Sequence, residues 1–177
     1  MSGDKGALNK ITFYLLEREI IVTNNDVLRR IRYIFDFGDA KMIELFALAN
    51  ADVTREQVSN WLKSDDDPAF QVCSDIDLAI FLNGLINERR GKKEGAQPEP
   101  EQGLTNNIIF RKLKIALDLK AEDILEILEL SDVHISKHEL SALFRKWGHK
   151  HYRECKDQIL RNFLNGMQLK YRDKSQG

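Results

Sequence analysis

The feature of this sequence that most constrains its fold is an internal repeat. Residues 23–85 align with residues 105–167 at a constant offset of 82 without a gap, and about a quarter of the aligned columns are identical. The alignment ends on four consecutive identities, Phe81-Leu82-Asn83-Gly84 with Phe163-Leu164-Asn165-Gly166. A gapless match of this length predicts that one structural unit is present twice.

Apolar residues recur within each copy at the spacing of a helix face. The first stripe of the first copy holds Val27, Leu28, Ile31, Ile34 and Phe35. Three further stripes follow, at residues 42–48, 58–62 and 78–85, and each has its counterpart in the second copy. This pattern predicts an all-α fold built from two tandem modules of roughly 65 residues, each with four helices.

Capping residues and one polar stretch predict the borders of these units. Side-chain oxygens that can cap a helix precede or begin three helices of each copy: Thr23 and Thr105, Thr54 and Ser136, Asp75 and Asp157. Residues 91–104 contain two prolines among Gln and Glu and are interpreted as a linker. The expected units are an N-terminal extension at 1–22, repeats at 23–90 and 105–172, and a tail at 173–177. Residues 1–22 are either sequence upstream of a natural start at Val22 or a genuine extra element.

Composition excludes several classes of protein. Two cysteines are too few for a disulfide scaffold, and no apolar run approaches the roughly 20 residues that span a bilayer. The short apolar stretch at residues 11–16 runs directly into Glu17, which is not typical of a signal peptide. We therefore expect a cytoplasmic protein with no membrane contact.

The formal net charge of −1 conceals a difference between the two copies. Residues 23–90 hold eight Lys and Arg against twelve Asp and Glu, whereas residues 105–172 hold thirteen against nine. The repeats therefore carry net charges of −4 and +4. This split favours docking of one copy against the other, or head-to-tail self-association.

Several segments of the first repeat resemble one known family. The stretches TNNDVLRRIRYIF, QVSNWLK and CSDIDLAIFLNGL, the last followed by NERRGK, are similar to the YehS-like family of small bacterial proteins. The resemblance covers nearly everything from Thr23 to Arg172, and residues 1–22 depart from the family pattern. Because the family is described as a tandem domain of unknown function, the resemblance implies a bacterial cytoplasmic protein and carries over no catalytic or binding residue.

The order of helices in each copy is also similar to the phage-repressor type of helix-turn-helix domain, in which the third helix enters the major groove. The turn at residues 50–54 has no glycine, and Asp65-Asp66-Asp67 after the third helix would repel phosphates. The same region of the second copy is basic, with aromatic residues interleaved, which suits phosphate contact and base stacking. An ordinary solvated surface is the alternative interpretation.

Basic residues on the first helix of both copies add to this set, although their stems also suit a purely solvated helix flank. The candidate nucleic-acid or partner contacts are Arg29, Arg30, Arg32, Arg111, Lys112, Lys114, Arg145, Lys146, Trp147, Lys150 and Arg153.

One glycine lies inside the fourth helix of each copy, where it costs about 1 kcal/mol relative to alanine. Gly84 and Gly166 are therefore expected to allow close approach of another helix, within a module or between modules. Asn83 and Asn165 are expected to supply a hydrogen bond at that structural interface.

The remaining motifs carry little chemistry. His149, His151 and Cys155 form an H-x-H-x-x-x-C string, but a fourth zinc ligand is not evident, and solvated histidines beside a packed thiol are the preferred interpretation. We found no phosphate-binding loop, dinucleotide glycine motif or G-x-S-x-G elbow, so we expect no metal, no cofactor and no enzyme activity. The sequence favours a binding or adaptor protein that engages another macromolecule. The alternatives are a DNA- or RNA-binding protein that uses the basic second repeat, and an enzyme whose site is assembled from distant residues.

Overall fold

The computed structural model describes residues 21–173, and all regular structure within that range is helical, which confirms the all-α prediction. The helices are α2 (Asn24–Phe35), α3 (Asp39–Leu48), α4 (Arg55–Leu62), α5 (Asp75–Arg90), α6 (Asn106–Ala116), α7 (Ala121–Glu129), α8 (Lys137–Leu143) and α9 (Asp157–Tyr171). Each helix from α6 to α9 begins 82 residues after its counterpart from α2 to α5. The interpretations of residues 1–20 lie outside the described part of the chain. No helix within residues 21–173 is long and apolar enough to cross a membrane.

The helix caps follow the predicted residues at the first and third helices of each repeat. Thr23, Thr105, Thr54 and Ser136 each accept a hydrogen bond from a backbone N–H of the first helical turn. The prediction for the fourth helices is wrong, because Ser74 and Lys156 are the N-cap residues. Asp75 and Asp157 are instead the first helical residues, and their carboxylates accept hydrogen bonds from the side-chain amides of Asn24 (2.7 Å) and Asn106 (2.6 Å).

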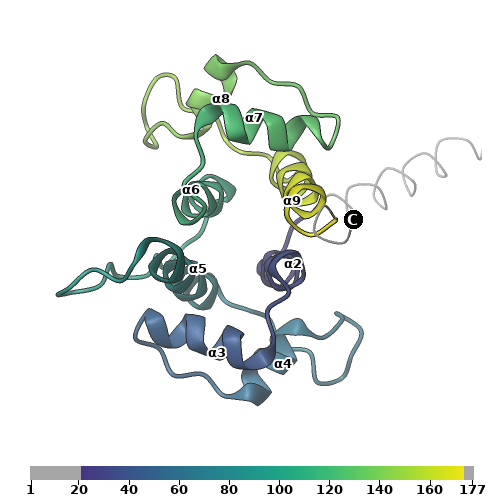
Figure 1. Ribbon diagram of the computed structural model, residues 1–177, viewed down its shortest axis with the longest axis vertical. Coiled ribbons are helices and arrows are strands. Elements are labelled where there is room, and N and C mark those ends of the chain that lie inside the picture. Colours follow the sequence, from purple (N-terminus) through teal and green to yellow (C-terminus); the bar gives the residue numbers. More distant parts are fainter. Residues whose placement is uncertain (1–20, 174–177) are drawn as a thin grey trace, which may run out of the picture.

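Four helices form a closed ring at the centre of the molecule, and Figure 1 views this ring end-on. Going round it, α2 contacts α9, α9 contacts α6, α6 contacts α5, and α5 contacts α2. The pairs α3–α4 and α7–α8 lie at opposite ends of the long axis, outside the ring. Two of the four contacts, α2 with α9 and α5 with α6, join one repeat to the other.

All four ring helices run in the same direction. The Asn24–Asp75 hydrogen bond holds the start of α2 beside the start of α5, and Asn106–Asp157 does the same for α6 and α9. At the other end, the ion pair between Arg90 and Asp118 (2.9 Å) joins the ends of α5 and α6. Because the helices are parallel, the linker must return along the whole length of the ring, and the N–H of Leu104 donates to Asp75 (3.0 Å) at its far end.

The helix-four glycines lie at helix crossings within each repeat. A Cβ on Gly84 would lie 1.7 Å from the backbone oxygen of Leu45 in α3, and one on Gly166 would lie 1.9 Å from that of Ile127 in α7. No side chain larger than hydrogen fits at these positions unless a helix moves. Each glycine therefore sets how deeply the fourth helix packs against the second.

A buried asparagine near the start of helix one holds three segments of each repeat together. Asn107, 2% exposed, donates to the backbone oxygens of Leu143 (2.9 Å) and Arg153 (2.8 Å) and accepts from the N–H of Cys155 (2.9 Å). Asn25 makes the same three bonds, to Trp61, Gln71 and Cys73. One side-chain amide thus fixes the end of helix three and the loop segment that leads into helix four.

Substituting alanine at Gly84 or Gly166 should destabilise the protein by about 3 kcal/mol or more, because the added methyl overlaps a backbone carbonyl that cannot rotate away. Gly38→Ala is the matched control, since nothing lies within 4 Å of its Cβ position and its φ is −76°. Urea denaturation of the three variants measures the difference. Equal urea midpoints for Gly38→Ala and Gly84→Ala would contradict the close contact of Gly84 with the backbone of α3.

Replacing Asn107 with alanine should cost at least about 3 kcal/mol, because three buried backbone groups lose a partner at about 1–3 kcal/mol each. Tyr152→Phe removes one hydroxyl that also donates to Asn107 (3.0 Å) and should cost only about 1 kcal/mol. Chemical denaturation measures both. Equal losses in the free energy of unfolding for the two substitutions would contradict the conclusion that the Asn107 amide holds these segments together.

Candidate functional site

An exposed basic loop, residues 144–153, connects α8 to the segment that leads into α9. The backbone N–H of Arg153 donates to Ala142 (3.0 Å) and the hydroxyl of Tyr152 donates to Asn107, so the end of the loop is fixed to the core. Trp147 lies within it and is 82% exposed. Four cations lie close to Trp147 in the sequence: Arg145, Lys146, Lys150 and Arg153. None of the four forms an ion pair with a carboxylate of residues 21–173.

The equivalent loop of the first repeat has a different character. It carries Asp65, Asp66 and Asp67, and Asp65 accepts a hydrogen bond from Arg29 (3.1 Å). Phe70 stands at the position of Tyr152 and has no hydroxyl to reach the buried asparagine. The two loops are joined to the preceding helix by the same backbone hydrogen bond, but the second carries four cations where the first carries only Lys63, and only the second has an exposed indole.

The predicted basic residues of helix one are mostly engaged by the protein's own groups. Arg29 pairs with Asp26 (2.8 Å), and Arg32 pairs with Asp39 (3.3 Å). Lys114 lies over the ring of Phe144, 5.7 Å from its centroid. Arg111 is exposed and lines a cavity beneath the linker.

Two of these helix-one cations bridge the repeats. Lys112, only 7% exposed, donates to Asn83 of α5 (2.5 Å), and Arg30 donates to Asn165 of α9 (2.5 Å). The two bonds are equivalent under the repeat, so the sequence-predicted asparagines do lie at an interface, but it is the one between repeats. The prediction that Lys112 contacts an outside partner is therefore wrong, because its amine is buried between the repeats.

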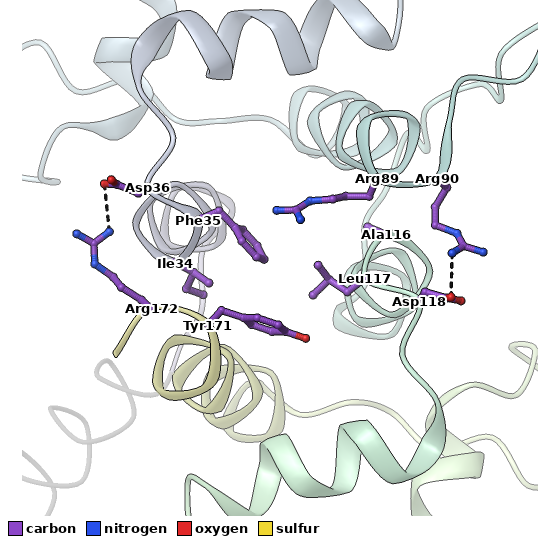
Figure 2. A pocket seen from close by; sticks show the side chains of 10 residues that line it. All are labelled: Ile34, Phe35, Asp36, Arg89, Arg90, Ala116, Leu117, Asp118, Tyr171 and Arg172. Atoms are coloured by element: carbon purple, nitrogen blue, oxygen red, sulfur yellow. Dashed lines mark hydrogen bonds and ion pairs between the residues drawn. The ribbon is translucent and has the colours of Figure 1, made fainter. Parts of the chain in front are cut away.

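A pocket of about 530 Å³ opens at the centre of the ring, where the four helices end (Figure 2). Phe35, Leu117 and Tyr171 point into it, and the guanidinium of Arg89 lies 4.7 Å from the centroid of the Phe35 ring. Figure 2 shows an ion pair on each side: Arg90 with Asp118 (2.9 Å) and Arg172 with Asp36 (3.4 Å).

These two ion pairs are equivalent under the repeat and both cross between repeats. The arginines lie at the carboxyl ends of parallel helices, where cations are stabilised by the helix dipoles. The sequence pattern did not predict these pairs as part of a site, although Asp36 with Asp118 and Arg90 with Arg172 are identities at the repeat offset. The pocket is lined by four apolar residues, three arginines, two aspartates and Tyr171.

The H-x-H-x-x-x-C string does not bring its three side chains to one place. His149 and His151 are exposed with ring centroids 5.6 Å apart, whereas the Cys155 thiol is 1% exposed in the core. Within the described part of the chain, no three His, Cys, Asp or Glu residues are grouped to hold a metal ion.

Both thiols should resist chemical modification in the folded protein. Burial raises the pKa of Cys73 and of Cys155 to about 12, so almost no thiolate is present at pH 8. We expect Ellman's reagent to react only at the rate of unfolding. Because the unfolded thiols ionise near 9.0 and the folded ones do not, stability should also fall as pH rises above about 9. Rapid labelling of native protein at pH 8 would contradict the burial.

Comparison with known proteins gives the same duplication as the structure. The family described as "Protein of unknown function (DUF1456)" matches residues 24–91 and again residues 106–173. A relative, the uncharacterised protein YehS of Escherichia coli (strain K12), is 46% identical over 145 residues, which are 81% of this chain and 93% of the relative. No solved structure matches the chain. The family resemblance is thus confirmed, and the chain belongs to the DUF1456 family with two tandem copies of its domain.

Proposed function

We propose that this protein is a non-enzymatic binding module that engages a macromolecule, and that the geometry favours a nucleic acid bound at the basic loop. The observation that carries the proposal is Trp147, 82% exposed among four cations that pair with no carboxylate of residues 21–173. Cations neutralise phosphates, and an exposed aromatic ring offers a stacking surface to an unpaired base.

Single-stranded nucleic acid suits this surface better than the major groove of a duplex. A helix-turn-helix mode would place α8 in the groove, but α8 has seven residues. Lys137 on it pairs with Glu122 (2.6 Å), and Glu139 folds back to cap its start (2.7 Å). The cations and the indole lie on the loop after α8, where a flexible strand can follow them.

The competing hypothesis is a protein adaptor whose acidic partner binds the same loop. It needs the cations but not base stacking, so the two hypotheses differ in what Trp147 should contribute. A cytoplasmic location and self-association of the oppositely charged repeats remain predictions from the sequence.

Binding of labelled single-stranded 12-mers, followed by fluorescence anisotropy at several salt concentrations, tests the proposal. Three to four phosphate contacts predict a slope of about −2 to −3 in log K against log salt. Trp147→Ala should weaken binding by about 5- to 150-fold, since stacking is worth about 1–3 kcal/mol per base. Neutralising Arg145, Lys146 and Lys150 together should reduce the slope by about 2.

Two matched controls accompany these variants. Val72→Ala removes an apolar side chain that is 74% exposed on the first repeat, and Arg55→Gln removes an exposed cation of α4. Neither should change binding. Failure of the wild-type protein to bind at low salt would end the nucleic-acid proposal, and binding unaffected by Trp147→Ala would favour the acidic protein partner.

A further inference from the structure

The ring has two outer grooves between repeats, and the 82-residue offset relates one to the other. The groove between α5 and α6 is lined by Lys112, and the groove between α2 and α9 by its counterpart Arg30. Four more pairs of equivalent residues line the two grooves: Arg111 and Arg29, Ile115 and Tyr33, Ile108 and Asp26, Ile86 and Gln168.

The chain's own linker covers the α5–α6 groove and encloses about 880 Å³. Glu101 of the linker pairs with Lys112 (3.0 Å), and the amide of Asn87 donates to Gln97 (2.9 Å). The linker has no regular secondary structure, contains Pro98 and Pro100, and carries three glutamates against two lysines. The groove at this kind of helix pair therefore accepts a non-helical segment with a glutamate carboxylate at the helix-one cation.

The α2–α9 groove is a hollow of about 630 Å³, lined by residues of α2 and α9, by Asp65, and by Ile21 and Val22, the first residues that the structure describes. Its central cation, Arg30, donates to Gln168 (2.7 Å) as well as to Asn165. Burial and the nearby Arg161 lower the pKa of the Arg30 guanidinium. Neither arginine pairs with a carboxylate of residues 21–173, in contrast to Lys112.

The other charges of this groove do not cancel those two arginines. Asp26 and Asp65 both line it, but both already pair with Arg29. Three isoleucines of the strapped groove are replaced here by Asp26, Tyr33 and Gln168. The occupant must therefore be more polar than an apolar helix face, and it must bring negative charge to Arg30 and Arg161.

We propose that the α2–α9 groove binds an extended acidic peptide segment of a partner protein, with a glutamate carboxylate between Arg30 and Arg161. The chain supplies the template for this occupant, because its linker fills the equivalent groove with a glutamate on the equivalent cation. This site lies on a different surface from the basic loop and does not depend on nucleic-acid binding.

A second occupant has to be separated from the partner by experiment. At the same offset, Glu17-Arg18-Glu19 aligns with Glu99-Pro100-Glu101 of the linker. These residues lie outside the described part of the chain. If they fill the groove, a peptide added from outside will bind only after Glu17 and Glu19 are replaced by glutamine.

The test uses a labelled peptide with the sequence of residues 95–104, GAQPEPEQGL, added to the full-length protein. We expect saturable binding by fluorescence anisotropy, weakened about tenfold by Arg161→Gln and by a glutamine at the second glutamate of the peptide. Arg30→Gln should weaken it too, with thermal melting as a check because Arg30 also holds Asn165. Lys112→Gln, Arg145→Gln and Trp147→Ala should leave it unchanged.

Three results would overturn the proposal. These are no binding to the full-length protein, binding that appears only in the Glu17→Gln/Glu19→Gln variant, and binding that responds to Lys112→Gln but not to Arg161→Gln. The second result would assign the groove to the chain itself, and the third would show that the peptide displaces the linker. Arg145→Gln and Trp147→Ala alter the basic loop and serve as controls here. The peptide experiment can therefore succeed even if the protein does not bind nucleic acid.

Discussion

The buried amide near the start of helix one is the interaction on which the rest of each repeat depends. A peptide group removed from water costs free energy unless it is hydrogen-bonded, and the loop before helix four buries several such groups. Asn25 and Asn107 each satisfy two of them and, in addition, a carbonyl near the end of helix three. The neighbouring Asn24 and Asn106 then tie the start of helix one to the start of helix four. These four bonds per repeat force helices one and four to run side by side and parallel.

Parallel helices within a repeat lead directly to the arrangement of the two repeats. When the units pack about a two-fold relation, each helix one meets the helix four of the other unit, and all four helices point the same way. Several contacts between the repeats are then made twice, as Arg30–Asn165 and Lys112–Asn83 show in the middle of the ring and the two Arg–Asp pairs show at its end. Exposed ion pairs of this kind contribute little individually, so the buried helix faces carry most of the stability.

Function is to be sought where the two repeats differ. The residues that the repeats share form helix caps, helix crossings and the core. The loops after helix three differ in charge, with Asp65–Asp67 in the first repeat and Arg145–Arg153 in the second, although their backbones are held in the same way. The grooves differ in the same way, since the α5–α6 groove is covered by the linker and more apolar, whereas the α2–α9 groove is more polar. A duplicated scaffold with two diverged surfaces is suited to holding two different partners.

The sequence by itself determined the helical class, the duplication and most helix starts, because these depend on local periodicity and on capping side chains within four residues of the backbone groups they satisfy. It also indicated that Gly84 and Gly166 permit a close approach. It misassigned Asp75 and Asp157, whose carboxylates face an asparagine 51 residues away rather than their own helix.

Only the tertiary structure decided which surface residues are free. Arg30, Lys112 and Lys146 look alike in the sequence, yet two bridge the repeats and one is exposed. The pocket at the centre of the ring and the α2–α9 groove could not be predicted either, because each is formed by helices from both repeats. No local sequence pattern specifies which faces of two amphipathic units pack together.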